Sequence, residues 1–240
     1  MFSMYAAIVK NLRGDIAFEV NDREFIKGIE WLSKRFKYRN IGIGPRLAKK
    51  AGKSVEGFIG KPLRVLTYPV KDIEALIELL IDRANMDPIL IEALVLSSTY
   101  ISPLMIISEK YVELMDKIAV HKVKVRGSLD ISSWKLHMRI ADYSILDSYE
   151  ELVVESMKVI EGKVDVGSIL KLRHERILRD EKRYWRFKDL EGNEWTFLYY
   201  VDNLRLLIRL GLSPKELSLN QAAGLAIVPV INLTKAIRST

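Results

Sequence analysis

Basic side chains alternate with apolar ones in two short segments of the chain. Residues 122–126 read Lys-Val-Lys-Val-Arg, and residues 135–139 read Lys-Leu-His-Met-Arg. Because successive side chains of a strand point to opposite faces, the basic residues of each segment would share one face. Like charges that lie opposite each other destabilise a sheet, so such a face is typical of a protein that binds a polyanion. Long cationic side chains can reach both phosphates and base edges.

The candidate nucleic-acid-binding residues are the cations that could build this surface or extend it. In the second half of the chain they are Lys122, Lys124, Arg126, Lys135, His137, Arg139, Lys171, Arg173 and Arg186. In the first half they are Arg46, Lys49, Lys50, Lys53 and Arg64.

Charge is segregated along the chain. The whole sequence of 240 residues has a net charge of +7, but residues 34–64 alone hold ten basic residues against the single acid Glu56. The net charge is +9 over residues 34–64, +4 over residues 122–139 and +5 over residues 163–188. The remainder of the chain therefore has a net charge of −11. Basic windows of this kind favour a polyanionic partner.

Few residue types that do chemistry are present. The chain has no cysteine and three histidines, which excludes disulfides, thiolate metal sites and a cysteine nucleophile. We therefore expect no metal, no cofactor and no catalysis. If the protein is an enzyme, it is a metal-dependent nuclease whose acids come from Asp15, Glu19, Asp22 and Asp130, although these are more typical of turns and helix caps.

The basic window of the first half allows more than one interpretation. Residues 45–58 resemble the start of a helix-turn-helix, but Gly57, Gly60 and Pro62 would disrupt its recognition helix. Gly42 and Gly44 suggest a phosphate cradle, but neither a Walker sequence nor a dinucleotide fingerprint accompanies them. We interpret residues 40–61 as a flexible, phosphate-contacting loop or strand edge.

The expected elements of the first half are two strands, a helix, two further strands and a second helix. Strands are predicted at residues 2–9, 16–20 and 63–68, and a helix capped by Asn21 or Asp22 at residues 22–35. A further helix is capped by Asp72. Its apolar stripe consists of Ile73, Leu76, Ile77 and Leu80.

The second half is expected to repeat this order. A hairpin at residues 119–126 and 134–140 turns at Gly127-Ser128, and a long helix follows at residues 145–160. Extended segments are predicted at 169–178, 184–188 and 195–201, then a helix at 203–211. Between the halves, residues 88–117 indicate one broken or two short apolar helices.

The predicted fold class is therefore α+β, with two similar strand-strand-helix-strand-strand-helix units and curved antiparallel sheets. The units would span residues 1–86 and 119–240, joined by a helical connector at 87–118. The apolar stretch 88–107 is interrupted by Glu92, three serines and Pro103, and residues 222–233 are too few to cross a bilayer, so no membrane partner is expected. No secretion signal opens the sequence, so we expect a cytoplasmic protein, and the composition would suit a thermophile.

This architecture resembles the single-chain LAGLIDADG homing endonucleases, whose saddle-shaped sheets sit in the DNA major groove. The resemblance covers most of the chain and implies duplex DNA as the partner. The family's metal-binding acid precedes the first strand of each unit, but residues 113–118, Glu-Leu-Met-Asp-Lys-Ile, lack its terminal Asp-Gly. Asp116 is the nearest match. The resemblance therefore implies a relative that binds DNA without cutting it.

Two other classes of function remain open. Tandem ferredoxin-like units similar to those of the CRISPR repeat-cleaving endonucleases would make this an RNA-binding or RNA-processing protein, but their glycine-rich C-terminal loop is not found in residues 222–240. Alternatively, the chain is a structural subunit of a larger assembly. In that case the apolar segment 217–237 would dock on a protein partner or on a second copy.

Overall fold

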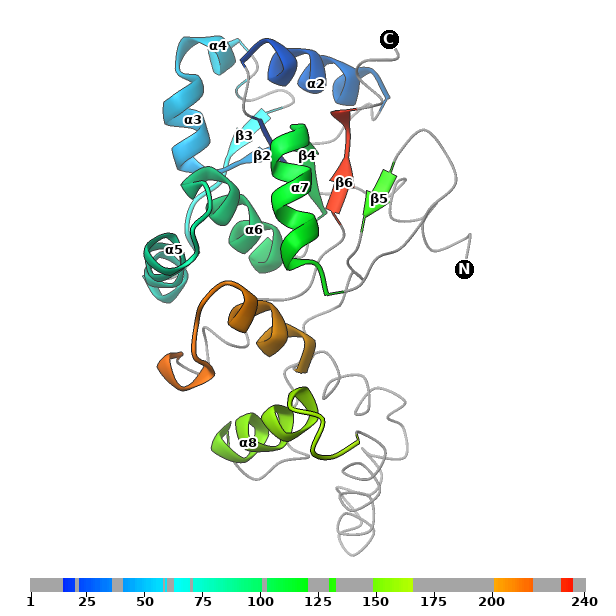
Figure 1. The fold of residues 1–240 in the computed structure, drawn as a ribbon. Coiled ribbons are helices and arrows are strands. Elements are labelled where there is room, and N and C mark those ends of the chain that lie inside the picture. Colours follow the sequence, from blue (N-terminus) through cyan, green and yellow to red (C-terminus); the bar gives the residue numbers. More distant parts are fainter. Residues whose placement is uncertain are drawn as a thin grey trace, which may run out of the picture. The chain divides into compact units, whose positions relative to one another are not determined.

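The computed structural model describes residues 15–19, 22–35, 41–57, 59, 63–69, 71–100, 103–120, 130–132, 149–165, 201–217 and 230–234. The chain divides into two compact units, one formed by residues 1–136 with 227–240 and the other by residues 137–226 (Figure 1). Each unit is described by itself below.

The first unit is built on a six-stranded sheet. Its strands are β1 (Asp15–Glu19), β2 (Ile41–Ile43), β3 (Leu63–Val65), β4 (Leu104–Ile107), β5 (Asp130–Ser132) and β6 (Val230–Asn232). They are ordered β3-β2-β1-β4-β6-β5. Five of them are parallel, and β5 alone runs antiparallel to its neighbour β6. The parallel order 3-2-1-4 is that of doubly wound α/β sheets, in which the chain reverses its winding between β1 and β4.

Helices make the crossovers between the parallel strands. In the first unit they are α2 (Asp22–Arg35), α3 (Pro45–Ala51), α4 (Lys53–Glu56), α5 (Lys71–Arg83), α6 (Pro88–Tyr100) and α7 (Glu109–Ile118). In the second unit the structure describes α8 (Tyr149–Ile160), a helix over residues 201–209 and the short 3-10 helix η2 (Pro214–Glu216).

Local sequence fixes where several of these helices begin and end. The Asp87 carboxylate accepts a hydrogen bond from the Ile89 backbone N–H at 2.8 Å, and Pro88 takes the first helical position of α6. Ser108 caps α7 in the same way. Glycines follow the C-terminal ends of two helices of the second unit. Gly162 follows α8 with φ +71°, and Gly211 follows the helix over residues 201–209 with φ +84°. Such left-handed turns suit glycine.

Helix α6 is the centre of the first unit. All ten residues from Ile89 to Ser98 are buried, and this stretch is apolar on every side apart from Glu92 and two serines. It contacts β1 of the sheet, α5 and α3. A helix that is hydrophobic all round belongs in a protein interior, because it leaves no polar face for solvent. Glu92 is therefore a carboxylate placed inside the core.

Several predicted elements of the first half are confirmed. The expected mixture of helices and strands is observed, α2 spans the predicted residues 22–35, and β3 begins at the predicted strand start. Helix α5 follows its predicted stripe, because the four residues named from their spacing are all buried: Ile73, Leu76, Ile77 and Leu80. Periodicity is a strong signal for an amphipathic helix of this length.

The predicted strand direction was wrong for every described strand except β5. We expected curved antiparallel sheets, but β1, β2, β3, β4 and β6 are parallel because helices lie between consecutive strands. Residues 88–117 also differ from the expectation of one broken or two short helices, since Leu104–Ile107 between α6 and α7 form the central strand β4. This segment thus belongs to the first unit.

The predicted duplication stays a prediction. Of the hairpin expected at residues 119–140, the structure describes only a coil at 119–120 and the strand β5, which starts three residues after the expected Gly127 turn. The extended segments expected at 169–188 and the strand expected at 2–9 lie outside the described residues. Among the described helices, none is both long and apolar enough to span a bilayer.

Truncation of a β4 side chain should test the position of this strand in the core. Ile106 has no exposed surface, so we expect Ile106→Ala to lower the free energy of unfolding by about 2–5 kcal/mol. The matched control is Ile59→Ala, because Ile59 is 49% exposed and its sheet contact is a backbone bridge. We expect the control to cost less than about 1 kcal/mol. Equal losses in urea denaturation would contradict a buried β4.

Candidate functional site

A row of basic residues follows α3 into α4. Arg46, Lys49 and Lys50 are three and four positions apart, so they lie on one side of α3. Leu47 and Ala51 are the residues of α3 buried against the core. The helix ends at Gly52, with φ +51°, and α4 begins with Lys53.

The flexible loop predicted for this window was wrong for residues 45–56, which form two short helices. Gly57 follows α4, and α4 has only four residues. That length is too short for the recognition helix of a helix-turn-helix.

Lys49, Lys50 and Lys53 are exposed and form no ion pair with any residue that the structure describes. The helix dipole accounts for Lys49 and Lys50, because cations are favourable in the last turn of a helix. It does not account for Lys53, because α4 is a single turn of four residues and Lys53 belongs to its first and its last turn alike. We refer to these three residues as the lysine cluster.

Arg64 is the fifth described candidate. It is exposed on β3, the strand at one edge of the sheet, and pairs in register with Gly42 of β2. Charged side chains on edge strands discourage pairing with other chains, so Arg64 has a structural explanation of its own. The remaining nine candidates lie outside the described residues, and they are Lys122, Lys124, Arg126, Lys135, His137, Arg139, Lys171, Arg173 and Arg186.

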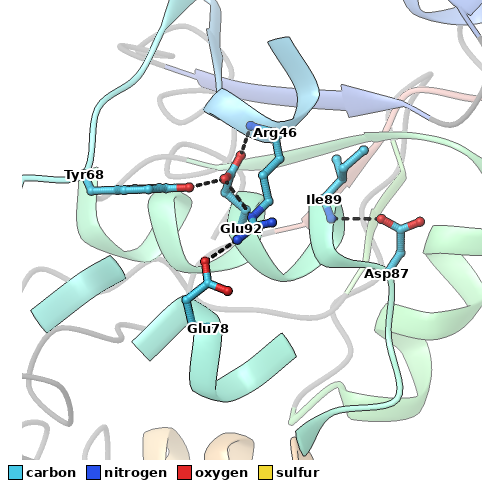
Figure 2. A network of polar contacts seen from close by, with 6 residues as sticks. All are labelled: Arg46, Tyr68, Glu78, Asp87, Ile89 and Glu92. Carbon is cyan, nitrogen blue, oxygen red and sulfur yellow. Dashed lines mark hydrogen bonds and ion pairs between the residues drawn. The ribbon is translucent and has the colours of Figure 1, made fainter. Parts of the chain in front are cut away.

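Arg46 differs from the lysine cluster because its guanidinium is already engaged. One terminal nitrogen bonds the Glu78 carboxylate of α5, and Nε lies 3.5 Å from Glu92 Oε2 (Figure 2). Two carboxylates therefore surround one guanidinium, and with both ionised the formal charge of this trio is −1. Among the described candidates, Arg46 is the one least suited to binding a phosphate.

Glu92 is the buried centre of this network. Its side chain is 1% exposed, and both of its oxygens accept hydrogen bonds. The Arg46 backbone N–H donates to Oε1 at 3.0 Å, and the Tyr68 hydroxyl donates to Oε2 (Figure 2). Tyr68 lies three residues after β3, and Arg46 lies three residues after β2. The carboxylate thus joins α6 to the segments that leave two neighbouring strands.

Gly44 allows the carboxylate to come this close. A Cβ atom built on Gly44 would lie 1.9 Å from Glu92 Oε1, so a side chain at this position would force the Glu92 carboxylate away from its present place. Gly44 has φ −73°, so its backbone conformation is open to other residues, and only the contact with Glu92 favours glycine here. The glycine that suggested a phosphate cradle instead makes room for a carboxylate of the protein itself.

Burial dominates the electrostatics of the network. Loss of hydration raises the pKa of Glu92 above its ordinary value, while the hydrogen bonds from Tyr68 and from the Arg46 backbone and the Arg46 charge act in the opposite direction. Burial, followed by the hydrogen bond to Glu92, raises the pKa of Tyr68 as well, so this hydroxyl keeps its proton as the donor.

The arrangement suits a structural role for Glu92 rather than proton transfer. Both oxygens are occupied and the side chain is closed to solvent, so a substrate has no route to the carboxylate. Within the part of the chain that the structure describes, no group of three or more His, Asp or Glu side chains is arranged to hold a metal ion. The two carboxylates near Arg46 are therefore partners of a protein cation.

Sequence reasoning missed Glu92, Tyr68 and Glu78 as partners of Arg46. One signal was available: Glu92 is the only charged residue in the apolar run 88–107, and a buried carboxylate requires a partner. The identity of the partner was not readable, because Arg46 lies 46 positions from Glu92 and 32 from Glu78.

Comparison with known proteins adds no relative. No family model, no curated protein and no solved structure matches the chain.

The raised pKa of Glu92 predicts a specific dependence of stability on pH. The folded state holds the Glu92 proton more tightly than the unfolded state, so this group stabilises the fold below the usual carboxylate pKa of about 4.3. Its contribution is lost as the pH rises from there through the raised folded pKa. In Glu92→Gln this titration is absent, so the stability of the wild type relative to the variant should fall across that window.

Urea denaturation of both proteins between about pH 3.5 and 8 measures this difference. A wild type that gains stability relative to Glu92→Gln as the pH rises would show that the Arg46 ion pair outweighs burial and that the pKa is lowered instead. A Glu56→Gln control should leave the pH profile close to that of the wild type, because Glu56 is exposed.

Proposed function

We propose that this protein binds nucleic acid, duplex DNA in the first place, through its basic surfaces and without catalysis. The observation that carries the proposal is the lysine cluster, three exposed cations that have no acidic partner among the described residues. A phosphate backbone would supply the anions that these cations lack. The basic strand faces predicted around Lys124 and Arg139 are further candidates for phosphate contacts.

Electrostatics within the cluster supports a polyanionic ligand. Lys49, Lys50 and Lys53 place three like charges within five residues, and like charges this close together repel one another. Residues 44–57 hold four basic residues against one acid, a local charge of +3. A phosphate backbone would neutralise this repulsion and release its own counterions.

Phosphate contacts position a protein on DNA but do not read sequence. The lysine cluster is therefore a non-specific anchor in this proposal, and α4, with four residues, supplies no recognition helix. Any base contacts would come from the candidates around residues 122–139. The architectural resemblance to homing endonucleases favours duplex DNA, but the role of the lysine cluster does not depend on it.

Neutralising the lysine cluster should weaken binding to duplex DNA. We expect the triple variant Lys49→Gln/Lys50→Gln/Lys53→Gln to lose about threefold to a hundredfold in affinity at 0.1 M salt, since each exposed ion pair contributes about 0.2–1 kcal/mol. The slope of log K against log salt should become shallower by up to about 2.7, because each phosphate that is no longer neutralised reduces it by about 0.9. Fluorescence anisotropy of a labelled duplex over a salt series measures both.

A control of equal charge is Lys27→Gln/Lys110→Gln/Lys117→Gln, which neutralises three exposed lysines on α2 and α7. Its affinity should stay within about twofold of the wild type, because only long-range screening changes. Equal losses in both triples would mean that net charge alone drives binding and that the lysine cluster is not the site.

Single-stranded DNA and structured RNA belong in the same series, with magnesium present and products resolved on a denaturing gel. A preference for RNA would favour the RNA-binding alternative. Specific cleavage would overturn the non-catalytic part of the proposal. No binding to any of these ligands at low salt would reject nucleic acid altogether and favour a subunit of an assembly.

A further inference from the structure

Helix α3 has no capping side chain of its own. Its N-cap residue is Gly44, in extended conformation with φ −73° and ψ 160°, and no side chain from its own segment accepts a hydrogen bond there. The first turn of a helix has backbone N–H groups without intrahelical partners. In α3 one of them, on Arg46, donates to Glu92 Oε1 of α6 at 3.0 Å.

We propose that Glu92 caps α3 from another helix and thereby positions Lys49 and Lys50 for phosphate binding. Where DNA affinity is concerned, the inference rests on the proposed function. Glu92 itself is closed to solvent, so it acts through α3 and makes no contact with the ligand.

The length of α3 makes this cap important. Isolated helices shorter than about 12–15 residues are marginal in water, and α3 has seven residues. Its order therefore depends on what holds it from outside, which is the burial of Leu47 and Ala51 together with the Glu92 cap. Lys49 and Lys50 lie in the last turn of the same helix. If the first turn frays, both lysines lose a fixed position, and binding must then order them again.

Tyr68 and Arg46 hold the cap in place. The Tyr68 hydroxyl binds Oε2 of the same carboxylate and leaves Oε1 to the Arg46 N–H. The Arg46 side chain lies between Glu92 and Glu78, so the residue that receives the cap also supplies its counter-charge (Figure 2). Arg46 thus interacts with Glu92 through both its backbone and its side chain, which explains why Arg46 is paired with acids while the lysine cluster is not.

A serine at position 44 and the Glu92 carboxylate are alternative N-caps for α3. Serine is among the best N-cap residues, and the backbone of Gly44 already has the extended conformation of an N-cap. In the wild type a Cβ at this position would collide with Glu92 Oε1. Once Glu92 is shortened, that space is open, and a serine at position 44 could cap α3 locally. Gly44→Ser should therefore destabilise the first turn of α3 in the wild type and stabilise it in Glu92→Ala.

The test is a double-mutant cycle of Gly44→Ser and Glu92→Ala, read by hydrogen exchange of the α3 amides and by DNA affinity. The Ala48 amide, which bonds the Gly44 carbonyl oxygen at 3.0 Å, reports on the first turn. We expect Glu92→Ala to speed its exchange by about 2- to 30-fold, the range that corresponds to loss of an N-cap. Gly44→Ser should also speed exchange in the wild type but slow it in Glu92→Ala.

Helix α7 is the internal control, because Ser108 caps it locally and none of these changes touches it. Its exchange should stay constant across the cycle. If Gly44→Ser speeds α3 exchange equally in both backgrounds, Glu92 is not an alternative cap and the inference fails. Should Glu92→Ala not fold, Glu92→Met keeps the length of the side chain but removes both acceptor oxygens. Unchanged α3 exchange in that variant would overturn the inference.

DNA affinity separates the two proposals. We expect affinity to fall about threefold in Glu92→Ala and to recover in the double variant, with an unchanged salt slope, because the lysines remain but are less ordered. A general loss of structure would not be reversed by serine at position 44. Faster α3 exchange at constant affinity would reject the positioning role. A wild type that binds no nucleic acid would reject the proposed function, while the exchange cycle would still decide the capping role.

Discussion

The buried carboxylate of Glu92 is the constraint around which the first unit is arranged. An ionised carboxylate inside an apolar helix loses its hydration, and it is tolerated only where donors and a counter-charge replace that hydration. Here the Arg46 N–H, the Tyr68 hydroxyl and the Arg46 guanidinium supply them. The absence of a side chain at position 44 leaves the carboxylate room to sit against these donors. One charge in α6 thus determines the residue after β2, the start of α3 and the course of the chain after β3.

The parts of the fold that could be predicted were those whose sequence carries a period. The four buried residues of helix α5 were predicted correctly, because the apolar residues of a surface helix recur at a fixed spacing on one face. Strand β4 could not be predicted. Its four residues Leu104–Ile107 are all buried, and such a short continuous apolar run looks the same in a buried helix and in a strand covered on both faces. With β4 taken as helix, the parallel order around it could not be recognised either.

The candidate site was predictable to the extent that it depends on local charge. A run of cations against one acid leaves exposed lysines whatever the fold, and Lys49, Lys50 and Lys53 are exposed. The state of Arg46 depends instead on pairing across the fold. Its partners lie 32 and 46 positions away on two different helices, and no local pattern in one sequence reveals such distant contacts. Four neighbouring cations therefore divide into one structural residue and three that are available to a ligand.

This division gives the basic surface a boundary. At the start of α3, the single cation Arg46 is already paired with Glu78 and Glu92, so it offers a phosphate no unpaired charge. One turn later Lys49 and Lys50 face solvent, and Lys53 follows beyond Gly52. Arg46 is one helical turn from Lys49, so the charges at the two ends of this short segment act on a ligand together, and the acids beside Arg46 reduce the attraction at the start of α3. A polyanion would therefore contact the end formed by α4 and the last turn of α3, and the acids beside Arg46 would limit how far it extends.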